Sequence, residues 1–521
     1  MSRGAVMLAA LLFLYCGLQE GQCARILALL NLASPSHYIF NRALLIALAN
    51  KGHQVTVVTT EVEKHPVPNM KTIVMDGIYD TSIEYRDPVS LTETSAVEMT
   101  FITYDWGHYM CEKQLQSAGA QELLNYSSSE KFELIITEAG WGECFFGFIH
   151  KFGSPPVVAT SGIGVPPWIS LTTGNPENPS YMPNFLLPYT SRMSFSERIC
   201  NFLTHIFVTF LYEYSYIPRQ EALARKYFKQ DLPPFMDIWR NFSIVLVNTL
   251  AGLDDPRPLL PSVVPIGGMH IKPQPDPLPQ DLKTFLDEAK DGFIFFSLGT
   301  NLRSNKMALD KRQAFLEAFS ELSQSVLWKF ESGILPGKPP NLKIGKWLPQ
   351  SDILAHPNIR MFITHCGMMS SVEAAYRGVP IVGIPFFLDQ KVNAMKFVKR
   401  GLGVQLHYDK LTKESVLTAV REILNNDSYR TNMRRLSAVF RDQPQTPLDR
   451  AVYWTEYVIR HKGAPHLRSA AADLSWYQYL LLDVILVLST GALLVVLISY
   501  LALRTLYRIL TRKPTKKEKT K

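Results

Sequence analysis

The sequence predicts an α/β protein with two doubly wound domains that face each other across a cleft, followed by one transmembrane helix near the C-terminus. Two stretches of alternating strands and helices, a Pro-rich segment between them and a late uncharged apolar run carry this prediction. We expect the domains at residues 24–260 and 281–470, a linker at 261–280 and the transmembrane helix at 480–503.

The N-terminus predicts a secretory signal peptide over residues 1–23. An apolar run, AVMLAALLFLY, follows Arg3 and gives way to small and polar residues. This run is too short to span a bilayer, and a strand is expected directly after it, at residues 25–30.

The two domains begin with the same predicted order of strand, helix and strand on either side of the linker. A strand at 25–30, a helix at 39–50 and a strand at 55–59 open the first domain. The segment PSVVPIGGMHIKPQPDPLPQ then indicates a stiff, extended linker. Beyond it, a strand at 293–298, a helix at 311–323 and a strand at 326–330 open the second domain.

The most informative segment runs from Trp347 to Gln390. It predicts a buried strand at 359–364, a polar turn at 365–367, a helix starting near Ser370 and a second strand at 380–384. In open α/β sheets, ligands bind where such strands end, and a helix N-terminus favours phosphate. The polar residues gathered there suit a nucleotide-sugar.

Each of these side chains has a candidate role. Trp347 would stack on a base, and Glu373 would accept hydrogen bonds from ribose hydroxyls. His365 and the helix start would hold a diphosphate, while Asp389 and Gln390 would bind sugar hydroxyls. Two simpler roles compete: packing of Trp347 in a core, and capping of the helix by Glu373, three residues after Ser370.

The same segment resembles the signature of membrane-bound animal UDP-glycosyltransferases of invertebrate type, in glycosyltransferase family 1. The matching residues are Trp347, Pro349 and Gln350; His356 and Pro357; Thr364, His365 and Gly367; Ser370 and Glu373; Gly378 to Pro380; and Pro385, Asp389 and Gln390. The resemblance implies the GT-B fold, with two Rossmann-like domains, and transfer of a hexose from a UDP-sugar. Many members carry Asn where this chain has Met369, although invertebrate members often have an apolar residue there.

A second loop resembles the family's phosphate contact. It follows the strand at 293–298, in FFSLGTNLRS, where Gly299 allows close backbone approach and Thr300 offers a hydroxyl. Arg303 would add positive charge there, or lie on the surface.

The catalytic base is expected to be His37. The sequence LNLASPSHYIF puts it in the loop between the first strand and the first helix, and the resemblance places the family's base at this histidine. A base histidine needs a carboxylate partner. Glu138 fills the position of the family's strand-end aspartate, Glu143 competes for the role, and both also fit solvated loop acids.

The expected reaction needs no metal and no cofactor beyond the UDP-sugar co-substrate. The sequence holds no D-x-D motif and no His, Cys or carboxylate cluster with metal-ligand spacing. Helix dipole, His365 and hydroxyls would then stabilise the leaving diphosphate. Direct displacement on an α-linked donor gives a β-glycoside.

The acceptor is expected to be a small lipophilic alcohol or phenol, as in detoxification or in hormone or pigment conjugation. Residues 97–109, 163–189 and 202–216 are rich in aromatic residues and predict an apolar acceptor pocket. Glucose is the expected sugar, with glucuronic acid and galactose left open. The alternatives are biosynthetic transfer to a membrane lipid and a non-catalytic lipophile carrier, against which His365, Glu373, Asp389 and Gln390 argue.

The C-terminal end predicts a single-pass type I protein of the endoplasmic reticulum membrane, with the domains luminal. Residues 484–503 are uncharged, and the tail at 504–521 carries eight Lys or Arg against one acid. Lys517 and Lys519 resemble a dilysine retrieval signal, and the glycosylation sequons at Asn125, Asn241 and Asn426 all lie on the predicted luminal side.

Charge and cysteine content exclude two other classes. The formal net charge is +8, and the tail supplies 8 − 1 = +7 of it, so the rest is nearly neutral and unlike a nucleic-acid binder. Six cysteines do not make a disulfide scaffold. One bridge among Cys111, Cys144, Cys200 and Cys366 is left open, with buried free thiols favoured. Homo- or hetero-oligomers are also left open.

Overall fold

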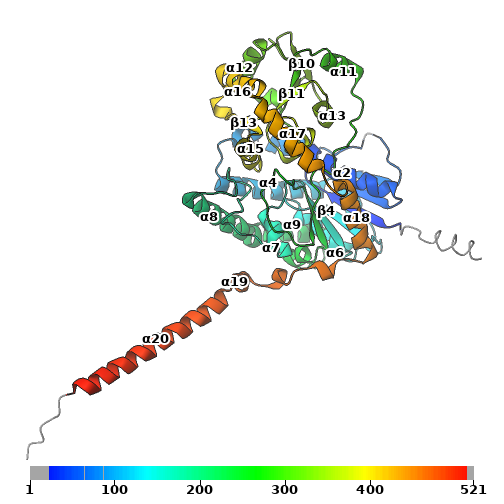
Figure 1. Cartoon of the computed structure of the whole chain (residues 1–521). Coiled ribbons are helices and arrows are strands. Elements are labelled where there is room, and N and C mark those ends of the chain that lie inside the picture. The colour runs from blue at the N-terminus through cyan, green and yellow to red at the C-terminus, as the bar shows by residue number, and fades with distance from the viewer. Residues whose placement is uncertain (1–22, 64, 86, 513–521) are drawn as a thin grey trace, which may run out of the picture. The chain divides into compact units, whose positions relative to one another are not determined.

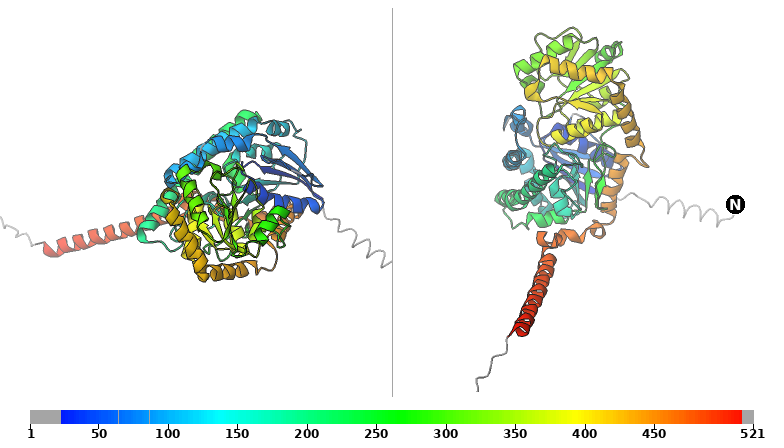
Figure 2. Two further views of the ribbon diagram at one scale, coloured as in Figure 1. Left: turned by 90° about the horizontal axis from the view of Figure 1, so that it is seen from above. Right: turned by 60° about the vertical axis from the view of Figure 1, so that its left-hand side comes forward.

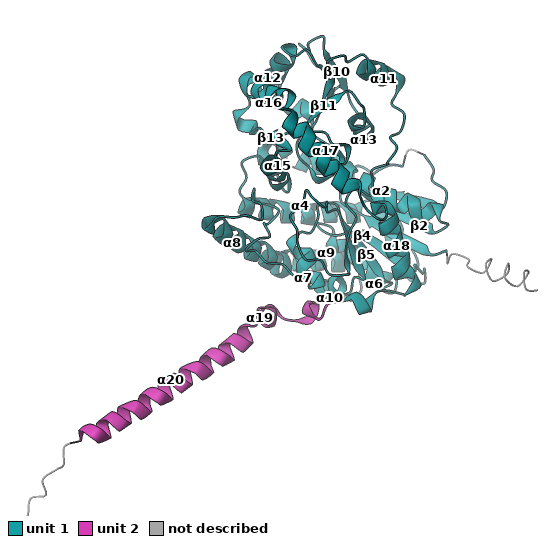
Figure 3. Cartoon of the chain, viewed as in Figure 1, with its two compact units in different colours: residues 1–468 teal, residues 469–521 magenta. Residues whose placement is uncertain are grey.

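The structure is a computed structural model that describes residues 23–63, 65–85 and 87–512. The predicted signal peptide lies outside these residues except for Cys23, and the retrieval signal at Lys517 and Lys519 lies outside them entirely. The chain forms two compact units, residues 1–468 and 469–521 (Figure 3). The described strands all belong to the first unit, where they form two sheets in opposite halves (Figures 1 and 2).

The N-terminal sheet has seven parallel strands in the order β3-β2-β1-β4-β5-β6-β7. Central strands such as β4 are buried along their full length, as expected for a parallel sheet with both faces covered by helices. The strands are β1 (Arg25–Leu30), β2 (Gln54–Thr59), β3 (Met70–Val74), β4 (Leu134–Glu138), β5 (Val157–Ser161), β6 (Ile244–Val247) and β7 (Val263–Pro265).

The helices of this half include two that begin at capping boxes, which satisfy orphan backbone donors. In α4 the box is formed by Ser95 and Glu98, and in α8 by Ser194 and Glu197. The helices are α2 (Pro35–Asn50), α3 (Ile78–Tyr85), α4 (Ala96–Gln116), α5 (Ala118–Leu124), α6 (Phe146–Lys151), α7 (Pro167–Thr173), α8 (Phe195–Leu211), α9 (Ile217–Phe228) and α10 (Phe235–Arg240).

The C-terminal sheet has six parallel strands in the order β10-β9-β8-β11-β12-β13. They are β8 (Phe293–Ser297), β9 (Ser325–Lys329), β10 (Leu342–Gly345), β11 (Ile359–Thr364), β12 (Ile381–Gly383) and β13 (Gly403–Gln405). The helices are α11 (Gln280–Asp287), α12 (Leu309–Ser320), α13 (Gln350–Leu354), α14 (Met368–Arg377), α15 (Gln390–Lys399), α16 (Lys413–Asn425), α17 (Asp427–Arg441) and α18 (Pro447–Arg460).

The course of the chain between the two halves differs from the predicted boundaries. β7 lies inside the Pro-rich segment at 261–280 and pairs with β6, so the first part of that segment belongs to the sheet. α18 packs against α2 and β6, although residues 281–470 were assigned to the other domain. Apolar side chains at Val264 and Val452 join the same core as those of α2, which explains both departures.

Two local predictions were wrong. α2 begins at Pro35, so His37 lies in the first helical turn rather than in the loop before it; Pro at this position is compatible with a helix start. The favoured free thiols are replaced by a disulfide between Cys111 in α4 and Cys144, 33 residues later. Among the described residues, Cys23, Cys200 and Cys366 remain free.

The second unit contains α19 (Trp476–Tyr479) and α20 (Leu482–Thr511). α20 is the one helix in the described part of the chain that is long and apolar enough to cross a membrane. The helix runs on to Thr511, beyond the predicted end at residue 503, and so includes the first part of the predicted tail.

Candidate active site

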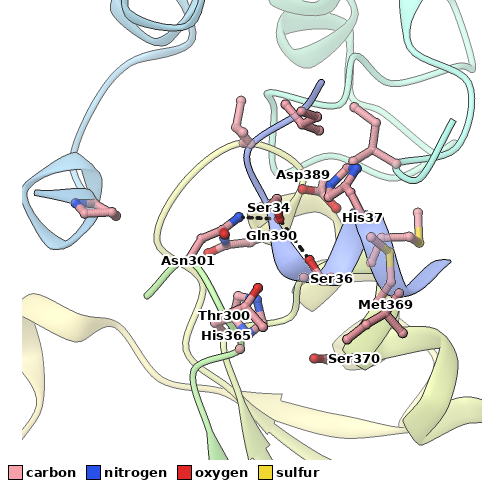
Figure 4. A pocket seen from close by; sticks show the side chains of 18 of the residues that line it. Ser34, Ser36, His37, Thr300, Asn301, His365, Met369, Ser370, Asp389 and Gln390 are labelled. Atoms are coloured by element: carbon pink, nitrogen blue, oxygen red, sulfur yellow. Dashed lines mark hydrogen bonds between the residues drawn. The ribbon is translucent and has the colours of Figure 1, made fainter. Parts of the chain in front are cut away.

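A cavity of about 410 Å³ is lined by segments that end or follow β1 in one sheet and β8, β9, β11 and β12 in the other (Figure 4). His37 lines it from the N-terminal half. The C-terminal half contributes all the side chains predicted to bind the nucleotide-sugar: Thr300, Trp347, Gln350, His365, Gly367, Ser370, Glu373, Asp389 and Gln390.

Strand order explains why His37 meets Glu138. β1 and β4 are parallel neighbours, with Leu29 opposite Thr137, so the turn after β1 and the end of β4 lie at the same sheet edge. Nδ1 of His37 makes a hydrogen bond to Oε1 of Glu138. Oε2 of Glu138 accepts from Asn41, one turn further along α2, at 3.4 Å.

These contacts orient the His37 ring. With Nδ1 donating to the carboxylate, the neutral tautomer leaves the lone pair on Nε2. Nε2 has no hydrogen-bond partner among the described residues, and the ring lines the cavity. His37 is thus arranged to take a proton from a molecule in the cavity.

Charge around His37 favours its protonated form. Burial by itself lowers the pKa of His37, but the charge of Glu138 and the hydrogen bond to it raise the pKa, and the charge of Asp389 adds to this. The net pKa lies above the ordinary value of 6.5. The imidazolium that a base forms during proton transfer is therefore stabilised.

Glu143 lies elsewhere. Its carboxylate is buried and accepts from the Tyr212 hydroxyl at 2.6 Å and from the backbone N–H of Gly142 at 3.0 Å. Burial raises the pKa of Glu143. Of the two acids left open by the sequence, Glu138 contacts His37 and Glu143 belongs to a tyrosine cluster in the core; neither is a solvated loop acid.

Asp389 and Gln390 stand at the start of α15, and Asp389 lies beside His37 of α2 (Figure 4). Oδ2 of Asp389 accepts from the Asn393 amide at 2.6 Å, and Oε1 of Gln390 accepts from the Phe386 backbone N–H at 2.9 Å. Burial raises the pKa of Asp389, while the charge of His37 opposes that rise. His37 and Asp389 therefore act on each other's pKa, although they belong to opposite halves of the first unit.

His365 follows β11 and is partly buried, with its ring packed between two glycines. A Cβ placed on Gly299 would lie 2.4 Å from the His365 ring, and one on Gly367 would also lie 2.4 Å from it. Gly299 also has a φ of +81°. Only glycine fits both positions with this ring between them.

His365 is neutral in this site. Burial, followed by the charge of Lys329, lowers its pKa to about 3. Its Nδ1 is buried without a hydrogen-bond partner among the described residues. An orphaned buried polar atom next to a helix N-terminus is a natural contact for an anionic group, and the N-terminus of α14 begins at Met368.

Gln350, Ser370 and Glu373 form a hydrogen-bonded cluster at one wall. The Gln350 amide donates to Ser370 Oγ at 2.9 Å and to Glu373 Oε2 at 2.8 Å. Gly367 is the N-cap of α14, and Ser370 lies inside the helix, so the capping role considered for Glu373 is wrong.

His270 completes this cluster and was missed by sequence reasoning. It is buried, lines the cavity and bonds through Nε2 to Glu373 Oε1 at 3.2 Å. His270 was not considered as a site residue because the segment 261–280 was predicted to be a linker. The run GGMH directly after an apolar strand was the available signal, because strand ends carry ligand-binding residues.

The three remaining side chains named from the sequence, those of Trp347, Thr300 and Arg303, are partly or largely exposed. Trp347 is 54% exposed, so the core-packing alternative is wrong. The backbone carbonyl of Thr300 accepts from the Tyr79 hydroxyl at 2.5 Å, which links the two halves. Arg303 pairs with Asp80 at 3.4 Å on the outside and is absent from the cavity lining.

Two of the three segments predicted to form the apolar acceptor pocket, 97–109 and 163–189, contribute to the cavity lining. Met99, Ile102 and Trp106 of α4 line the apolar end of the cavity, together with Ile163 and Trp141. Residues 202–216 contribute nothing to the lining, because α8 points its large apolar side chains outward.

No group of three or more His, Cys, Asp or Glu that could hold a metal occurs within residues 23–63, 65–85 and 87–512. The predicted metal independence stays a prediction.

Comparison with known proteins gives one consistent result. The family model described as UDP-glucoronosyl and UDP-glucosyl transferase matches residues 28–517. The chain is 38% identical to UDP-glycosyltransferase UGT5 of Dactylopius coccus, over 95% of this chain and 96% of the relative. It is 41% identical to UDP-glucosyltransferase 2 of the same insect, over 89% of each chain.

A relative of lower identity is named for its acceptor. The chain is 31% identical to 2-hydroxyacylsphingosine 1-beta-galactosyltransferase of Mus musculus, over 95% of this chain and 91% of the relative. Among solved structures, UDP-glucose: anthocyanidin 3-O-glucosyltransferase in complex with UDP is similar at a TM-score of 0.53 and 16% identity, over 84% of this chain and 99% of that one. This likeness confirms the predicted GT-B fold.

Proposed function

Since the chain belongs to the UDP-glucoronosyl and UDP-glucosyl transferase family and is a UDP-glycosyltransferase, we propose that it transfers glucose from UDP-glucose to the hydroxyl of small lipophilic acceptors. The proposal extends to the stereochemistry, with inversion at the anomeric carbon and a β-glycoside as product. The observation that carries it is the His37–Glu138 pair, which faces Asp389 across one cavity.

In the proposed reaction, Nε2 of His37 takes the proton of the acceptor hydroxyl as that oxygen attacks the anomeric carbon. The bond from this carbon to the diphosphate oxygen breaks, and UDP leaves with its electron pair. Glu138 holds the ring by Nδ1 and stabilises the imidazolium. The proton later passes from His37 to solvent.

The C-terminal half would hold the donor. Trp347 would stack on uracil, Glu373 with Gln350 would bind the ribose hydroxyls, and the diphosphate would lie against the His365 ring and the N-terminus of α14. The hydroxyls of Ser370 and Thr300 and the close backbone at Gly367 would complete the diphosphate site. Asp389 and Gln390 would bind the hydroxyls of the hexose, next to His37.

The charges of the lining favour a neutral sugar. Of the described residues that line the cavity, Lys329 is the only Lys or Arg, and its Nζ already donates to Glu331 at 2.8 Å. Lys329 also acts on the pKa of His365, which puts it on the diphosphate side. A glucuronate carboxylate would therefore meet the Asp389 carboxyl group with no cation of its own, which would weaken its binding.

A donor panel tests this proposal. Microsomes that express the full chain are expected to release UDP from UDP-glucose in the presence of a simple phenol, and far less from UDP-glucuronate or UDP-galactose. UDP release without a phenol serves as the blank. Preference for UDP-glucuronate would contradict the charge argument, and turnover with none of the three sugars would contradict the proposed reaction.

The second candidate function is transfer to a membrane lipid. The similarity to the sphingosine galactosyltransferase of mouse and the apolar lining from α4 favour it. Offering ceramide in place of the phenol in the same panel separates the two. Turnover with ceramide alone would select the lipid acceptor.

We expect His270 to act through Glu373 on donor binding. In His270→Ala the Glu373 carboxylate loses one of its two donors, so KM for the UDP-sugar should rise about tenfold while kcat stays within about twofold. His270→Asn, which keeps a side-chain donor, should recover part of the affinity. A fall in kcat at unchanged KM would contradict this positioning role.

The membrane topology is part of the proposal. α20 would anchor the chain in the endoplasmic reticulum membrane as a single-pass type I protein, with the first unit in the lumen. The exposed side chains of Asn125, Asn241 and Asn426 support this side, because luminal sequons on the surface are accessible to glycosylation.

A further inference from the structure

α8 is a surface helix that exposes most of its large apolar side chains. Such helices normally bury their apolar stripe and expose polar residues. Here seven large apolar residues of α8 and of the π-helical turn η3 (Tyr212–Tyr216) that continues it are 46 to 71% exposed: Phe195, Ile199, Phe202, Leu203, Ile206, Phe210 and Tyr214. We call this set the α8 face.

The buried side of the same helix carries two polar residues, Asn201 and Thr204, besides Val208, and it is held by hydrogen bonds. Asn201 donates to the carbonyls of Pro179 at 2.7 Å and Met182 at 2.9 Å, and its Oδ1 accepts from the Asn184 N–H at 2.7 Å. Thr204, one turn later, is also buried. The helix therefore cannot rotate to bury the α8 face without breaking these contacts.

The α8 face continues onto α4. Phe207 of α8 packs edge-to-face on Phe101, with ring centroids 5.7 Å apart, and Phe101 and Val97 are themselves about half exposed. α8 lies at the periphery of the first unit (Figures 1 and 3). Contiguous exposed apolar surface of this kind marks a contact with a protein or a membrane.

The chemistry of the face favours lipid. From Ile199 to Tyr212, fourteen residues, the sequence has no Asp, Glu, Lys or Arg. A protein interface would normally place a polar rim around its apolar centre. The chain also carries α20, so a bilayer is the apolar phase to which the first unit is permanently tethered, at high effective concentration.

We propose that α8 lies in the membrane interface, with the α8 face in the boundary between headgroups and acyl chains, as a second membrane contact of this chain besides α20. Amphipathic helices bind in this plane through buried apolar area. α4 borders both the α8 face and the cavity, to which Met99, Ile102 and Trp106 contribute. The contact would bring the apolar end of the cavity close to acceptors dissolved in the bilayer.

An environment-sensitive fluorophore tests the contact in the full-length chain. The chain is placed in phosphatidylcholine nanodiscs, one chain per disc, with Cys23→Ser and Cys200→Ser to remove free surface thiols. A nitrobenzoxadiazole label is attached at Leu203→Cys and, as matched control, at Ile334→Cys, an exposed apolar site of the C-terminal half. Ile206→Cys is a second probe position should the first fail to fold.

We expect blue-shifted emission at position 203 and at least threefold stronger quenching by nitroxide-labelled lipids than at position 334. Equal quenching at both sites would overturn the proposal. A blue shift at 203 that needs two chains per disc and is not quenched by nitroxide lipids would also overturn it, because it would assign the face to a second copy.

A triple variant distinguishes membrane contact through the α8 face from membrane anchoring through α20. Phe195→Ser, Phe202→Ser and Phe210→Ser together should abolish lipid quenching of a label at 206, while turnover of a water-soluble phenol stays within about twofold, since none of these residues lines the cavity. Leu309→Ser with Ile334→Ser is the control for loss of exposed apolar surface elsewhere. Retained quenching in the triple variant would contradict the proposal.

Discussion

His37→Ala is expected to lower kcat by about 10²–10⁴-fold, the range that a positioned general base supplies. The variant loses the group whose Nε2 faces the cavity, but it keeps the side chains that would bind the donor. UDP affinity, measured by calorimetry on the purified full chain, should therefore change less than threefold. UDP release from UDP-glucose with a phenol acceptor is the activity measurement.

The outcome separates three cases. Lost turnover with retained UDP binding supports His37 as the base. Turnover that survives the substitution would remove His37 from the reaction and direct attention to other groups of the cavity. Loss of both turnover and UDP binding would indicate a folding defect, in which case His37→Gln, a closer match in volume, repeats the test.

Glu138→Gln should have a comparable effect on kcat, about 10²–10⁴-fold, with an additional signature in the pH dependence. An amide can present N–H to Nδ1 and so stabilise the tautomer whose Nε2 carries a proton and cannot accept another. The substitution also removes the charge and the charged hydrogen bond that raise the pKa of His37.

The sign of the pH shift follows from the base role. In the wild type, we expect activity to fall as the pH drops through the raised pKa of His37, because an imidazolium cannot accept a proton. Without Glu138 the effect of burial prevails and the pKa of His37 falls, so the acid limb of kcat/KM should move to lower pH. The measurement is the pH profile of the residual activity.

Glu143→Gln is the matched control for Glu138→Gln. It removes a buried carboxylate of the same size from a tyrosine cluster that does not touch His37. Its acid limb should stay where the wild-type limb is. An acid limb that moves in Glu143→Gln and stays in Glu138→Gln would reverse the assignment of the partner.

Much of the fold, and most of the side chains that the C-terminal half contributes to the cavity, could be predicted from local sequence patterns. The strand at 359–364 was predicted with its observed bounds, because a buried parallel strand is a short apolar run bounded by turn residues. The motif residues from Trp347 to Gln390 follow consecutive strands of one parallel sheet, so their meeting at one edge follows from topology. The start of α2 was misplaced because SPSH permits either a loop or a helix beginning at proline.

Contacts between distant segments could not be predicted. The choice between Glu138 and Glu143 depends on how the chain turns after β4, within five residues of sequence. The role of His270 depends on a contact with Glu373, 103 residues away. The disulfide depends on the approach of α4 to the turn at Cys144. A local signal marks His270 as a strand-end residue, but none of these three pairings has a periodic or local signature of its own.

The sequence by itself determined the α/β class, the two-sheet layout, the family resemblance, the cavity-lining motif residues between Trp347 and Gln390, and the apolar C-terminal helix, since each is encoded in short-range spacing or hydrophobicity. The tertiary structure alone decided which carboxylate meets His37, that α18 returns to the N-terminal sheet, and that α8 turns its phenylalanines outward. The physical reason is that periodicity defines the apolar face of a helix but not the direction in which that face points. That direction is decided by contacts such as those of Asn201, which join residues far apart in the chain.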